Sequence, residues 1–508
     1  MPIFAAVDIG SNSVRLKVAR LVRRRLQTLY EDREVTRLGE AVFRGGLLEP
    51  AAMAQTIKVL QRFHRAAQKH GADRVRVVAT SALRDARNAH SFREWVRAAT
   101  GWQVEVVTGL DEARLIHLAI LSNSRLSPSP VLLMDLGGGS CELTVSRKGH
   151  IKETVSLPLG AVRLTREFLR HDPPKKKELA RMRKFIAEEV GRVAASIAAA
   201  RAHRMIATSG TAAALAENRR RAQGQRRGSV VVSRRAAIKM AAKLAKLRQE
   251  ERQRLPGIGT KRTEIIVAGA TVFAEVMERC GIPGFRYSPL GLRDGLLAEM
   301  AAEHDRRTRS RRQIESDRRD ALEALGARYQ ADAAHAQQVR EHALELFGEL
   351  RELHQLPAEY EEWLTAAAML HEVGGYVNRA GRHRHTYYII AHSELFGYTQ
   401  AQRRLIAAIA RYLGKSRPAP GDRALKMLPV SDREPVRRAV VLLRLAAALD
   451  QGRRGAVRRV RAKVKGGRVL LTLKSRRRSG ADLEVWALEK ERGYFREVFG
   501  RELAAALS

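Results

Sequence analysis

A chain of 508 residues exceeds the ~250–300 residues at which one hydrophobic core stops growing, so we expect several domains. Hydrophobic residues make up 45% of the sequence, which is enough to bury a sizeable core and excludes wholesale disorder. The formal net charge of +40 predicts attraction to polyanions such as nucleic acid, an anionic membrane or polyphosphate, without choosing among them.

The cysteine content and the N-terminal residues suggest where the protein works. Cys141 and Cys280 are too few for a disulfide framework and fit a reducing cytoplasm. Cys141 has no histidine nearby in sequence to activate it, so we expect a small buried residue and not a nucleophile. An apolar strand containing Asp8 opens the chain, so we expect no signal peptide. No apolar run reaches the ~18 residues of a membrane span.

The first part of the chain alternates predicted strands and helices. Pro50 favours the start of a helix and Gly71 its end, while Glu112 follows the start of another helix at Gly109. This order predicts an α/β lobe. We expect a strand hairpin over 4–21, strands over 27–38, 74–80 and 102–108, and helices over 51–70, over 89–100 and from 109 onward.

The same pattern starts again at Val131. In both places an apolar run ends in an aspartate, Asp8 or Asp135, and a turn of small residues leads into an alternating strand. Two such units about 130 residues apart predict two related lobes that face one cleft. In the second lobe we expect a strand hairpin over 131–145, strands over 151–157, 203–207 and 285–288, and helices from 161, over 175–200, after 208–211, over 263–280 and over 293–303.

Two basic segments of the second lobe carry no specific function. The segment 219–228 is typical of a solvated loop. The segment 256–262 resembles a shortened Walker loop, but its spacing is wrong and no clear strand precedes it, so it is rejected.

A run of mixed charge over 303–320 indicates a domain boundary. Beyond it the pattern becomes helical until about residue 450, and a small α+β tail follows, with alternating segments over 468–473 and 482–488. We therefore expect four domains, over 1–128, 129–304, 305–452 and 453–508.

The segment 131–145 combines the groups that phosphoryl transfer requires. Its three glycines let backbone N–H groups approach an anion, and Ser140 adds a hydroxyl. Asp135 can hold a cation at the strand end, and Glu142 follows the turn. Donors for phosphate beside carboxylates for metal and water describe a phosphoryl-transfer site. A glycine hairpin with two surface acids is the alternative interpretation of this segment alone.

Eight segments together resemble a known family. In chain order they read AAVDIGSNSVRL, VVATSALRDARN, GLDEARLIHLAI, LLMDLGGGSCEL, SLPLGAVRL, ATSGT, EIIVAGA and SPLGLRDGLL. They resemble the exopolyphosphatases and guanosine pentaphosphate phosphohydrolases over residues 1–300. The resemblance implies a two-lobed α/β fold of the actin type, which is related to ribonuclease H, sugar kinases and heat-shock chaperone ATPases. It also implies hydrolysis of a terminal phosphoanhydride.

The resemblance implies a role for each matching residue. Asp8 and Asp135 would bind Mg²⁺, and a monovalent cation is also possible in this family. Glu112 and Glu142 would position and deprotonate the attacking water, with Asp135 completing the catalytic set, and which glutamate is the base stays open. Arg84 would clamp phosphate oxygens, although a surface arginine is the alternative. The phosphate-binding loops would be Ser11, Asn12 and Ser13, then Gly137, Gly138, Gly139 and Ser140, and finally Ser209, Gly210 and Thr211.

The C-terminal region resembles the helical extension of long family members, which is related to HD-type phosphohydrolases. The matching residues are His335, His371, Glu372 and Asp450. An active HD site pairs histidine with aspartate, and His-Glu stands here instead, so we expect a degenerate site with a structural role. The residues Arg382, His383 and His385 suggest a basic surface loop that guides polyphosphate, or else a buried helix-packing cluster.

The sequence favours Mg²⁺-dependent, processive hydrolysis of inorganic polyphosphate in the cytoplasm. The alternatives are hydrolysis of guanosine pentaphosphate at its 5′ phosphate, and phosphate transfer to ADP. A protein of another class, which binds nucleic acid on an inactive phosphatase fold, is allowed by the charge but shows no recognition motif. The resemblance also implies a homodimer, and no membrane partner is expected.

Overall fold

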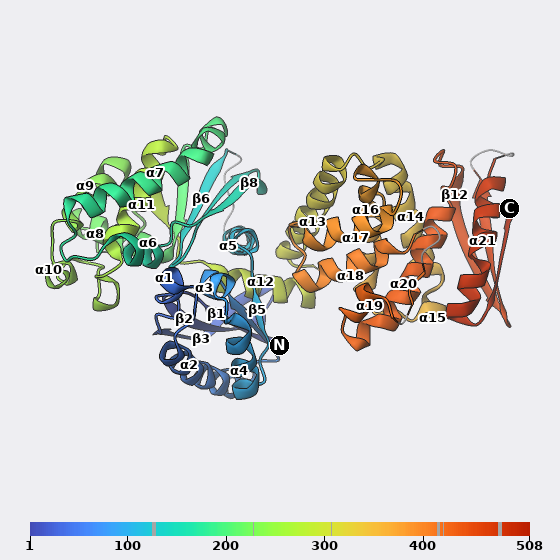
Figure 1. Ribbon diagram of the computed structural model, residues 1–508, viewed down its shortest axis with the longest axis horizontal. Helices are drawn as coiled ribbons and strands as arrows, with labels where there is room; N and C mark the ends of the chain where they lie inside the picture. Colours follow the sequence, from blue (N-terminus) through green and yellow to red (C-terminus); the bar gives the residue numbers. More distant parts are fainter. Residues whose placement is uncertain are drawn as a thin grey trace. The chain divides into compact units, whose positions relative to one another are not determined.

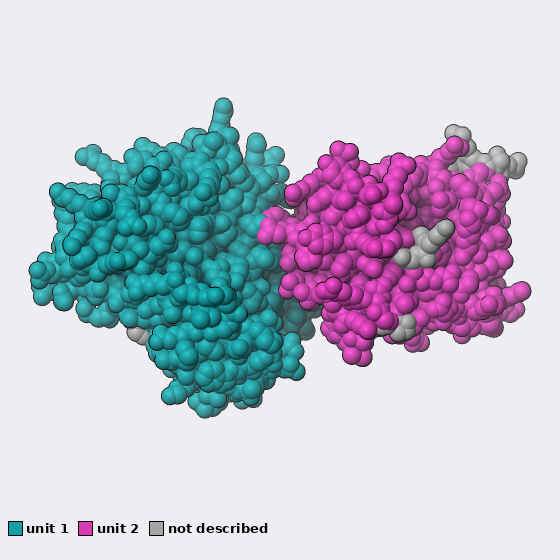
Figure 2. Space-filling view, viewed as in Figure 1, with its two compact units in different colours: residues 1–315 teal, residues 316–508 magenta. Residues whose placement is uncertain are grey.

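The computed structural model describes residues 1–123, 129–226, 228–305, 307–413, 417–419, 421–475 and 480–507. The chain forms two compact units, Met1–Glu315 and Ser316–Ser508, which are teal and magenta in Figure 2. The division falls inside helix α13 (Arg309–Arg328), within the predicted boundary run of mixed charge. The finer partition into four domains stays a prediction.

Unit 1 opens with a five-stranded sheet in the order β3-β2-β1-β4-β5. Strand β1 pairs antiparallel with β2 and parallel with β4, so the sheet is mixed. The strands are β1 (Ile3–Ile9), β2 (Ser13–Val22), β3 (Arg25–Val35), β4 (Arg74–Ala79) and β5 (Val104–Val106). The helices are α1 (Val42–Gly45), α2 (Pro50–Lys69), α3 (Ser81–Asp85), α4 (Ala89–Thr100) and α5 (Gly109–Asn123).

The second lobe of unit 1 repeats this arrangement. Its sheet has the order β10-β11-β9-β6-β7-β8, in which β6 pairs antiparallel with β7 and parallel with β9. The strands are β6 (Val131–Leu136), β7 (Cys141–Arg147), β8 (His150–Leu157), β9 (Arg204–Thr208), β10 (Val231–Ser233) and β11 (Gly284–Tyr287). Strands β8-β7-β6-β9-β11 thus match β3-β2-β1-β4-β5, and the predicted internal repeat is confirmed.

Helices surround the second sheet and complete unit 1 (Figure 1). They are α6 (Ala161–Phe168), α7 (Lys176–Ala199), α8 (Ser209–Ala222), α9 (Arg234–Leu244), α10 (Gln249–Gln253), the 3₁₀ turn η1 (Thr260–Arg262), α11 (Ile266–Arg279) and α12 (Leu292–His304). Strand β10 and helices α9 and α10 were not predicted from the sequence.

Helices α5 and α12 pack against each other between the two lobes. A Cβ atom on Gly295 would lie 2.0 Å from the backbone oxygen of Leu115, so only glycine allows this approach. Side chains of α5, α12, β1 and β6 share one buried cluster, which includes Ile116, Leu133 and Leu296. This shared core fixes one lobe against the other, and with it the cleft between them.

Unit 2 is helical with one small sheet. Its helices are α14 (Ala333–Glu349), α15 (Arg351–His354), α16 (Tyr360–Leu370), the 3₁₀ turn η2 (Val373–Tyr376), α17 (Arg382–His392), α18 (Gln400–Arg411), α19 (Arg423–Lys426), α20 (Val430–Ala448) and α21 (Asp482–Phe499). Strands β12 (Val457–Lys465), β13 (Arg468–Ser475) and β14 (Glu502–Leu507) form the sheet in that order. One buried core spans helices and sheet, from Ala321 to Leu503.

The prediction of a strand over 482–488 is wrong, because these residues open helix α21. Glu484, Ala487 and Leu488 are buried, whereas Leu483 and Trp486 are about half exposed, which is the spacing of one helix face. In a segment of seven residues with apolar side chains on both faces, the hydrophobic pattern of a strand, with a period of two, cannot be separated from that of a helix, with a period of 3.6.

Candidate active site

The two predicted phosphate loops form equivalent turns at the ends of the central strand pairs. The backbone N–H of Gly10 donates to the carbonyl of Ser13 at 3.1 Å, and that of Gly137 donates to Ser140 at 2.9 Å. A Cβ on Gly138 would lie 3.0 Å from the Cβ of Ser11, so the two loops face each other closely. The internal repeat therefore brings the two loops next to each other.

A cleft of about 380 Å³ lies between the lobes, and most of the predicted site residues line it. Helix α8 begins at the cleft with Ser209, whose φ of 93° is unusual for a residue with a side chain. The first N–H groups of a helix are suited to bind an anion. The predicted residues on the cleft wall are Asp8, Ser11, Asn12, Ser13, Glu112, Asp135, Gly137, Gly138, Ser140, Ser209, Gly210 and Thr211.

Three acidic side chains form a cluster at this cleft, two of them on its wall. Glu112, Asp135 and Glu142 each offer a carboxylate oxygen, and these oxygens lie within 4.8 Å of one another. Asp135 and Glu142 are directly opposite residues on β6 and β7. The hydroxyl of Thr208 donates to Asp135 Oδ1, and that of Ser156 donates to Glu142 Oε1 at 2.8 Å. Neighbouring strands thus hold both carboxylates in place.

Burial makes these acids hard to ionise. Burial and the neighbouring charges of Glu142 and Asp135 raise the pKa of Glu112 well above its ordinary value. Burial and Asp135 raise the pKa of Glu142 to about 7. Burial also raises the pKa of Asp135. Carboxylates that repel one another in this way gain from a bound cation, which lowers their pKa values.

The cluster fits a divalent metal ion. Glu112 Oε2 and Glu142 Oε2 are buried and have no hydrogen-bond partner among the described residues. Buried polar atoms without partners are costly, and a cation bound to several carboxylate oxygens removes that cost. Asp8 lies close enough to raise the pKa of Asp135, and burial raises its own pKa against the charges of Arg15, Arg293 and Arg33.

Three predicted residues do not belong to the cleft wall. Glu142 stands in the acidic cluster just behind it. Arg84 donates to the carbonyl of Val107 at 2.9 Å, and its charge lowers the pKa values of Glu112 and Glu142. Gly139 lies against Ser81, where a Cβ would be 2.3 Å from the hydroxyl oxygen.

Four arginines on the cleft wall were missed by the sequence analysis: Arg15, Arg33, Arg262 and Arg293. Partial burial and the charges of the other three lower the pKa of Arg33 to about 10, although part of its side chain is exposed. The carboxylates of Asp8, Glu31 and Asp294 stand among these arginines and offset part of their mutual repulsion. The cleft lining therefore combines these four arginines, called the basic wall below, with the carboxylates of Asp8, Glu31, Glu112, Asp135 and Asp294.

The internal repeat was a signal that could have identified Arg15. Asp8 pairs with Arg15 across β1 and β2, and Asp135 pairs with Glu142 across β6 and β7. Arg15 is thus the counterpart of Glu142. On the next strand Arg33 lies opposite Arg15.

The helical unit also brings its predicted residues together. One ligand atom each of His335, His371 and Glu372 lie within 4.8 Å of one another, and His335 Nδ1 bonds Asp450 Oδ2 at 2.7 Å. The residues Arg382, His383 and His385 form the first turn of α17 and are neither a loop nor fully buried, since Arg382 is exposed. A role for them in guiding polyphosphate stays a prediction.

Two further expectations can be compared with the structure. Cys141 and Cys280 are free and buried, and burial raises the pKa of the Cys141 thiol well above its ordinary value, so the prediction of a small buried residue is confirmed. In the described part of the chain, none of the helices has both the length and the apolar character needed to span a membrane.

Comparison with known proteins identifies the family. Residues 17–304 match the Ppx/GppA phosphatase family, and residues 318–492 match domain III of the Ppx/GppA phosphatases. The chain is 29% identical over 413 residues to the guanosine-5'-triphosphate,3'-diphosphate pyrophosphatase of Aeromonas hydrophila, a match that covers 80% of each protein.

Solved structures agree with this assignment. A Ppx/GppA family member from Aquifex aeolicus is 29% identical with a TM-score of 0.51, over 60% of this chain and 99% of that one. An exopolyphosphatase from Cytophaga hutchinsonii is 24% identical with a TM-score of 0.56, over 59% of this chain and 98% of that one, and supports the fold alone. The predicted two-lobed fold of the actin type is confirmed. The chain belongs to the Ppx/GppA phosphatase family and is a phosphoanhydride hydrolase.

Proposed function

We propose that this protein is an exopolyphosphatase, which hydrolyses the terminal phosphoanhydride of inorganic polyphosphate and releases orthophosphate in a Mg²⁺-dependent reaction. The observation that supports this proposal is that one cleft brings together an acidic cluster and four arginines. The terminal phosphate would lie at the acids, and the following phosphates would lie along the arginines.

The acidic cluster supplies the groups for hydrolysis. When bound by Asp135 and its neighbours, Mg²⁺ polarises the phosphoryl oxygens and offsets their charge. Burial and repulsion from neighbouring carboxylates raise the pKa values of Glu112 and Glu142, and a glutamate with a raised pKa is suited to accept the proton of the attacking water near neutral pH. The N–H groups of the two turns and of helix α8 bind the phosphoryl oxygens from either side.

The basic wall favours a chain of phosphates as substrate. Arg15, Arg33, Arg262 and Arg293 offer charge-assisted hydrogen bonds to any phosphate in reach. Such contacts are the same for every phosphate of a uniform polymer. The polyphosphate can therefore advance by one phosphate after each cleavage. This is the basis for processive hydrolysis.

Guanosine pentaphosphate is the second candidate substrate. Tyr287 lies on the cleft wall close to the charges of Arg15 and Arg262, and its exposed ring could stack on a base. The relative from Aeromonas hydrophila is named for this class of substrate. Among the described residues of the wall, Tyr287 is the one aromatic side chain that could bind a base, whereas four arginines could bind phosphates. This composition favours polyphosphate over guanosine pentaphosphate.

The test compares orthophosphate release from long-chain polyphosphate and from guanosine pentaphosphate, with Mg²⁺, for wild type and three variants. Glu112→Gln should abolish release from both substrates. Arg15→Gln should raise KM for polyphosphate about tenfold or more, since a charge-assisted hydrogen bond contributes ~1.5–3 kcal/mol. Arg20→Gln is the matched control, because Arg20 lies on the same strand β2 but is exposed outside the cleft.

The outcomes separate the hypotheses. A higher kcat/KM for guanosine pentaphosphate than for polyphosphate would show that guanosine pentaphosphate is the substrate, and the assignment of the site would stand. Release that survives in Glu112→Gln would refute the assignment of the acidic cluster. Equal KM values for Arg15→Gln and Arg20→Gln would refute the role of the basic wall.

A further inference from the structure

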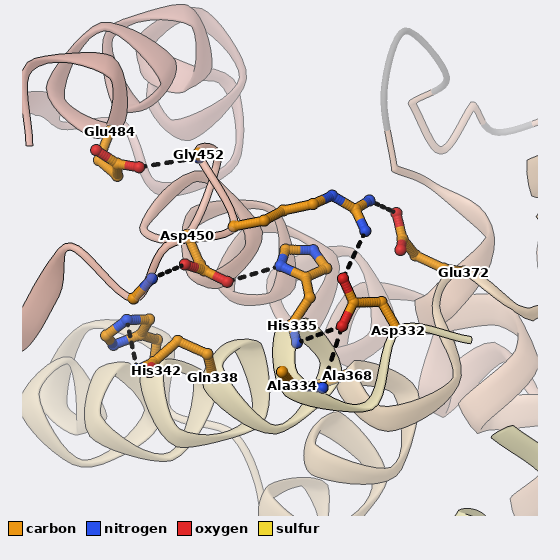
Figure 3. A network of polar contacts seen from close by, with 12 residues as sticks. Asp332, Ala334, His335, Gln338, His342, Ala368, Glu372, Asp450, Gly452 and Glu484 are labelled. Carbon is orange, nitrogen blue, oxygen red and sulfur yellow. Dashed lines mark hydrogen bonds and ion pairs between the residues drawn. The ribbon is translucent and has the colours of Figure 1, made fainter. Parts of the chain in front are cut away.

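Unit 2 contains a compact group of metal-ligand side chains that the phosphatase chemistry does not use. His335 stands in the first turn of α14, and His371 and Glu372 follow the end of α16. One atom from each side chain lies within 4.8 Å of the other two, and the two imidazole rings are 5.3 Å apart between centroids. Figure 3 shows His335 and Glu372 within a network of polar contacts that also includes Asp332 and Asp450.

Hydrogen bonds hold both histidines in the tautomer that binds metal. His335 Nδ1 lies 2.7 Å from Asp450 Oδ2, and His371 Nδ1 lies 2.6 Å from the carbonyl oxygen of Ala368. Both oxygens accept hydrogen bonds, so the proton of each ring is on Nδ1 and the lone pair is on Nε2. Metal-binding histidines are characteristically oriented by a carboxylate or a carbonyl at their other nitrogen.

The supporting residues are themselves fixed. Asp450 is 1% exposed, and its second oxygen accepts the backbone N–H of Gly455 at 2.9 Å. Glu372 Oε1 accepts a hydrogen bond from Arg453, which also donates to Asp332 at 3.2 Å, and a longer one from Arg382 at 3.5 Å. These contacts orient the carboxylate and leave Glu372 Oε2 to ligate an ion.

The three side chains are largely shielded from solvent. His335 and His371 are each 7% exposed, and the side chain of Glu372 is 16% exposed. Three protein ligands leave coordination positions that water can occupy. Two nitrogen ligands and one oxygen ligand suit zinc and its first-row neighbours, whereas magnesium prefers oxygen alone.

We propose that unit 2 binds one zinc ion, or a first-row divalent cation of similar character, through His335 Nε2, His371 Nε2 and Glu372 Oε2. The sequence had led us to expect a degenerate site, because glutamate replaces aspartate in the doublet. Glutamate has one more methylene than aspartate but presents the same oxygens, and the observed arrangement brings one of them to both imidazoles. The ion joins the start of α14 to the end of α16.

The experiment uses the full chain, freed of metal by chelation and titrated with Co²⁺ as a visible probe. Four-coordinate Co²⁺ with nitrogen ligands absorbs strongly in the visible, whereas six-coordinate Co²⁺ bound by carboxylate and water oxygens, as expected at the cleft acids, absorbs weakly. We expect one equivalent of this signal and its displacement by Zn²⁺. Glu372→Gln should remove it, since the amide keeps the hydrogen bond to Arg453 but is a poor ligand. Asp450→Asn should weaken binding about 10–100-fold, because it disturbs the orientation of His335.

Two control variants locate the signal. His342→Gln changes a buried histidine of the same helix α14 that bonds Gln338 and lies outside the cluster, so the signal should persist. Glu112→Gln changes the cleft, and the signal should again persist. Helical circular dichroism shows that each variant is folded. Absence of the signal in the wild type, its persistence in folded Glu372→Gln or its loss in Glu112→Gln would each overturn the proposal.

Discussion

Replacing Glu142 by glutamine should stabilise the metal-free protein while abolishing its activity. The carboxylate is 2% exposed, and burial with the charge of Asp135 raises its pKa from 4.5 to about 7. Glutamine has the same shape and can still accept the hydrogen bond of Ser156 through its amide oxygen. The variant therefore removes the charge and retains the packing.

The magnitude and the sign follow from proton linkage. The folded state binds more protons at this site than the unfolded state between about pH 4.5 and about pH 7, so the stability of the wild type falls as pH rises through that range. A shift of about 2.5 pKa units corresponds to roughly 3 kcal/mol. Relative to the wild type, Glu142→Gln should gain nothing near pH 4.5 and roughly 3 kcal/mol near pH 8.

The assay is urea unfolding in the presence of a chelator at several pH values. Because the chain has two compact units, hydrogen exchange of peptides from β6 and β7 identifies the transition of unit 1. Adding Mg²⁺ should stabilise the wild type more than the variant, since the ion offsets the charge that the variant lacks. A stability difference of the same size at all pH values would refute the electrostatic reasoning.

Two other substitutions test the groups around the cleft. Glu299→Ala should cost about 3–5 kcal/mol in the thermal unfolding of unit 1, because it removes the buried carboxylate that pairs with both Arg76 and the buried Arg114. The charges of those arginines outweigh burial and lower the pKa of Glu299 to about 2. The wild type should therefore lose the same stabilisation as pH falls from about 4.5 toward 2. A cost of the substitution that does not depend on pH would contradict this reasoning. Ser156→Ala removes a hydrogen bond to ionised Glu142 and should move the acidic limb of the pH–rate profile upward by about one unit. An unchanged profile would show that Glu142 does not control that limb.

The fold was predictable where local patterns repeat. The unit of strand, aspartate, small-residue turn and strand occurs twice, and both copies form the centre of a sheet with the same strand order. The helix over 89–100 was predicted at its observed bounds, because Gly101 follows it in the left-handed conformation that ends many helices. These features depend on neighbours in sequence, so sequence alone is sufficient to find them.

The rest of the fold depends on distant partners. Strand β10 has three residues and is held by pairing with β11, and β14 pairs parallel with β13 after the intervening helix α21. Short strands of this kind carry too few residues for a periodic signal, and their pairing is decided by the surrounding core. Helix α21 was mistaken for a strand for the same reason.

The candidate site divides in a similar way. Its acids and glycines stand in motifs, but the arginines of its basic wall are four among 94 lysines and arginines, and no local pattern distinguishes them. They come from strands β2 and β3, the turn η1 and the start of α12, and only the folded chain brings these together.

The proposed function draws on an asymmetry between the two lobes. Identical positions of the two hairpins hold Arg15 in one lobe and Glu142 in the other. Two acidic lobes would repel a phosphate chain, and two basic lobes would bind it without the carboxylates that hold metal and accept a proton. With arginine at this position in one lobe and glutamate in the other, a phosphate chain would be attracted by the arginines while its terminal phosphate met the carboxylates.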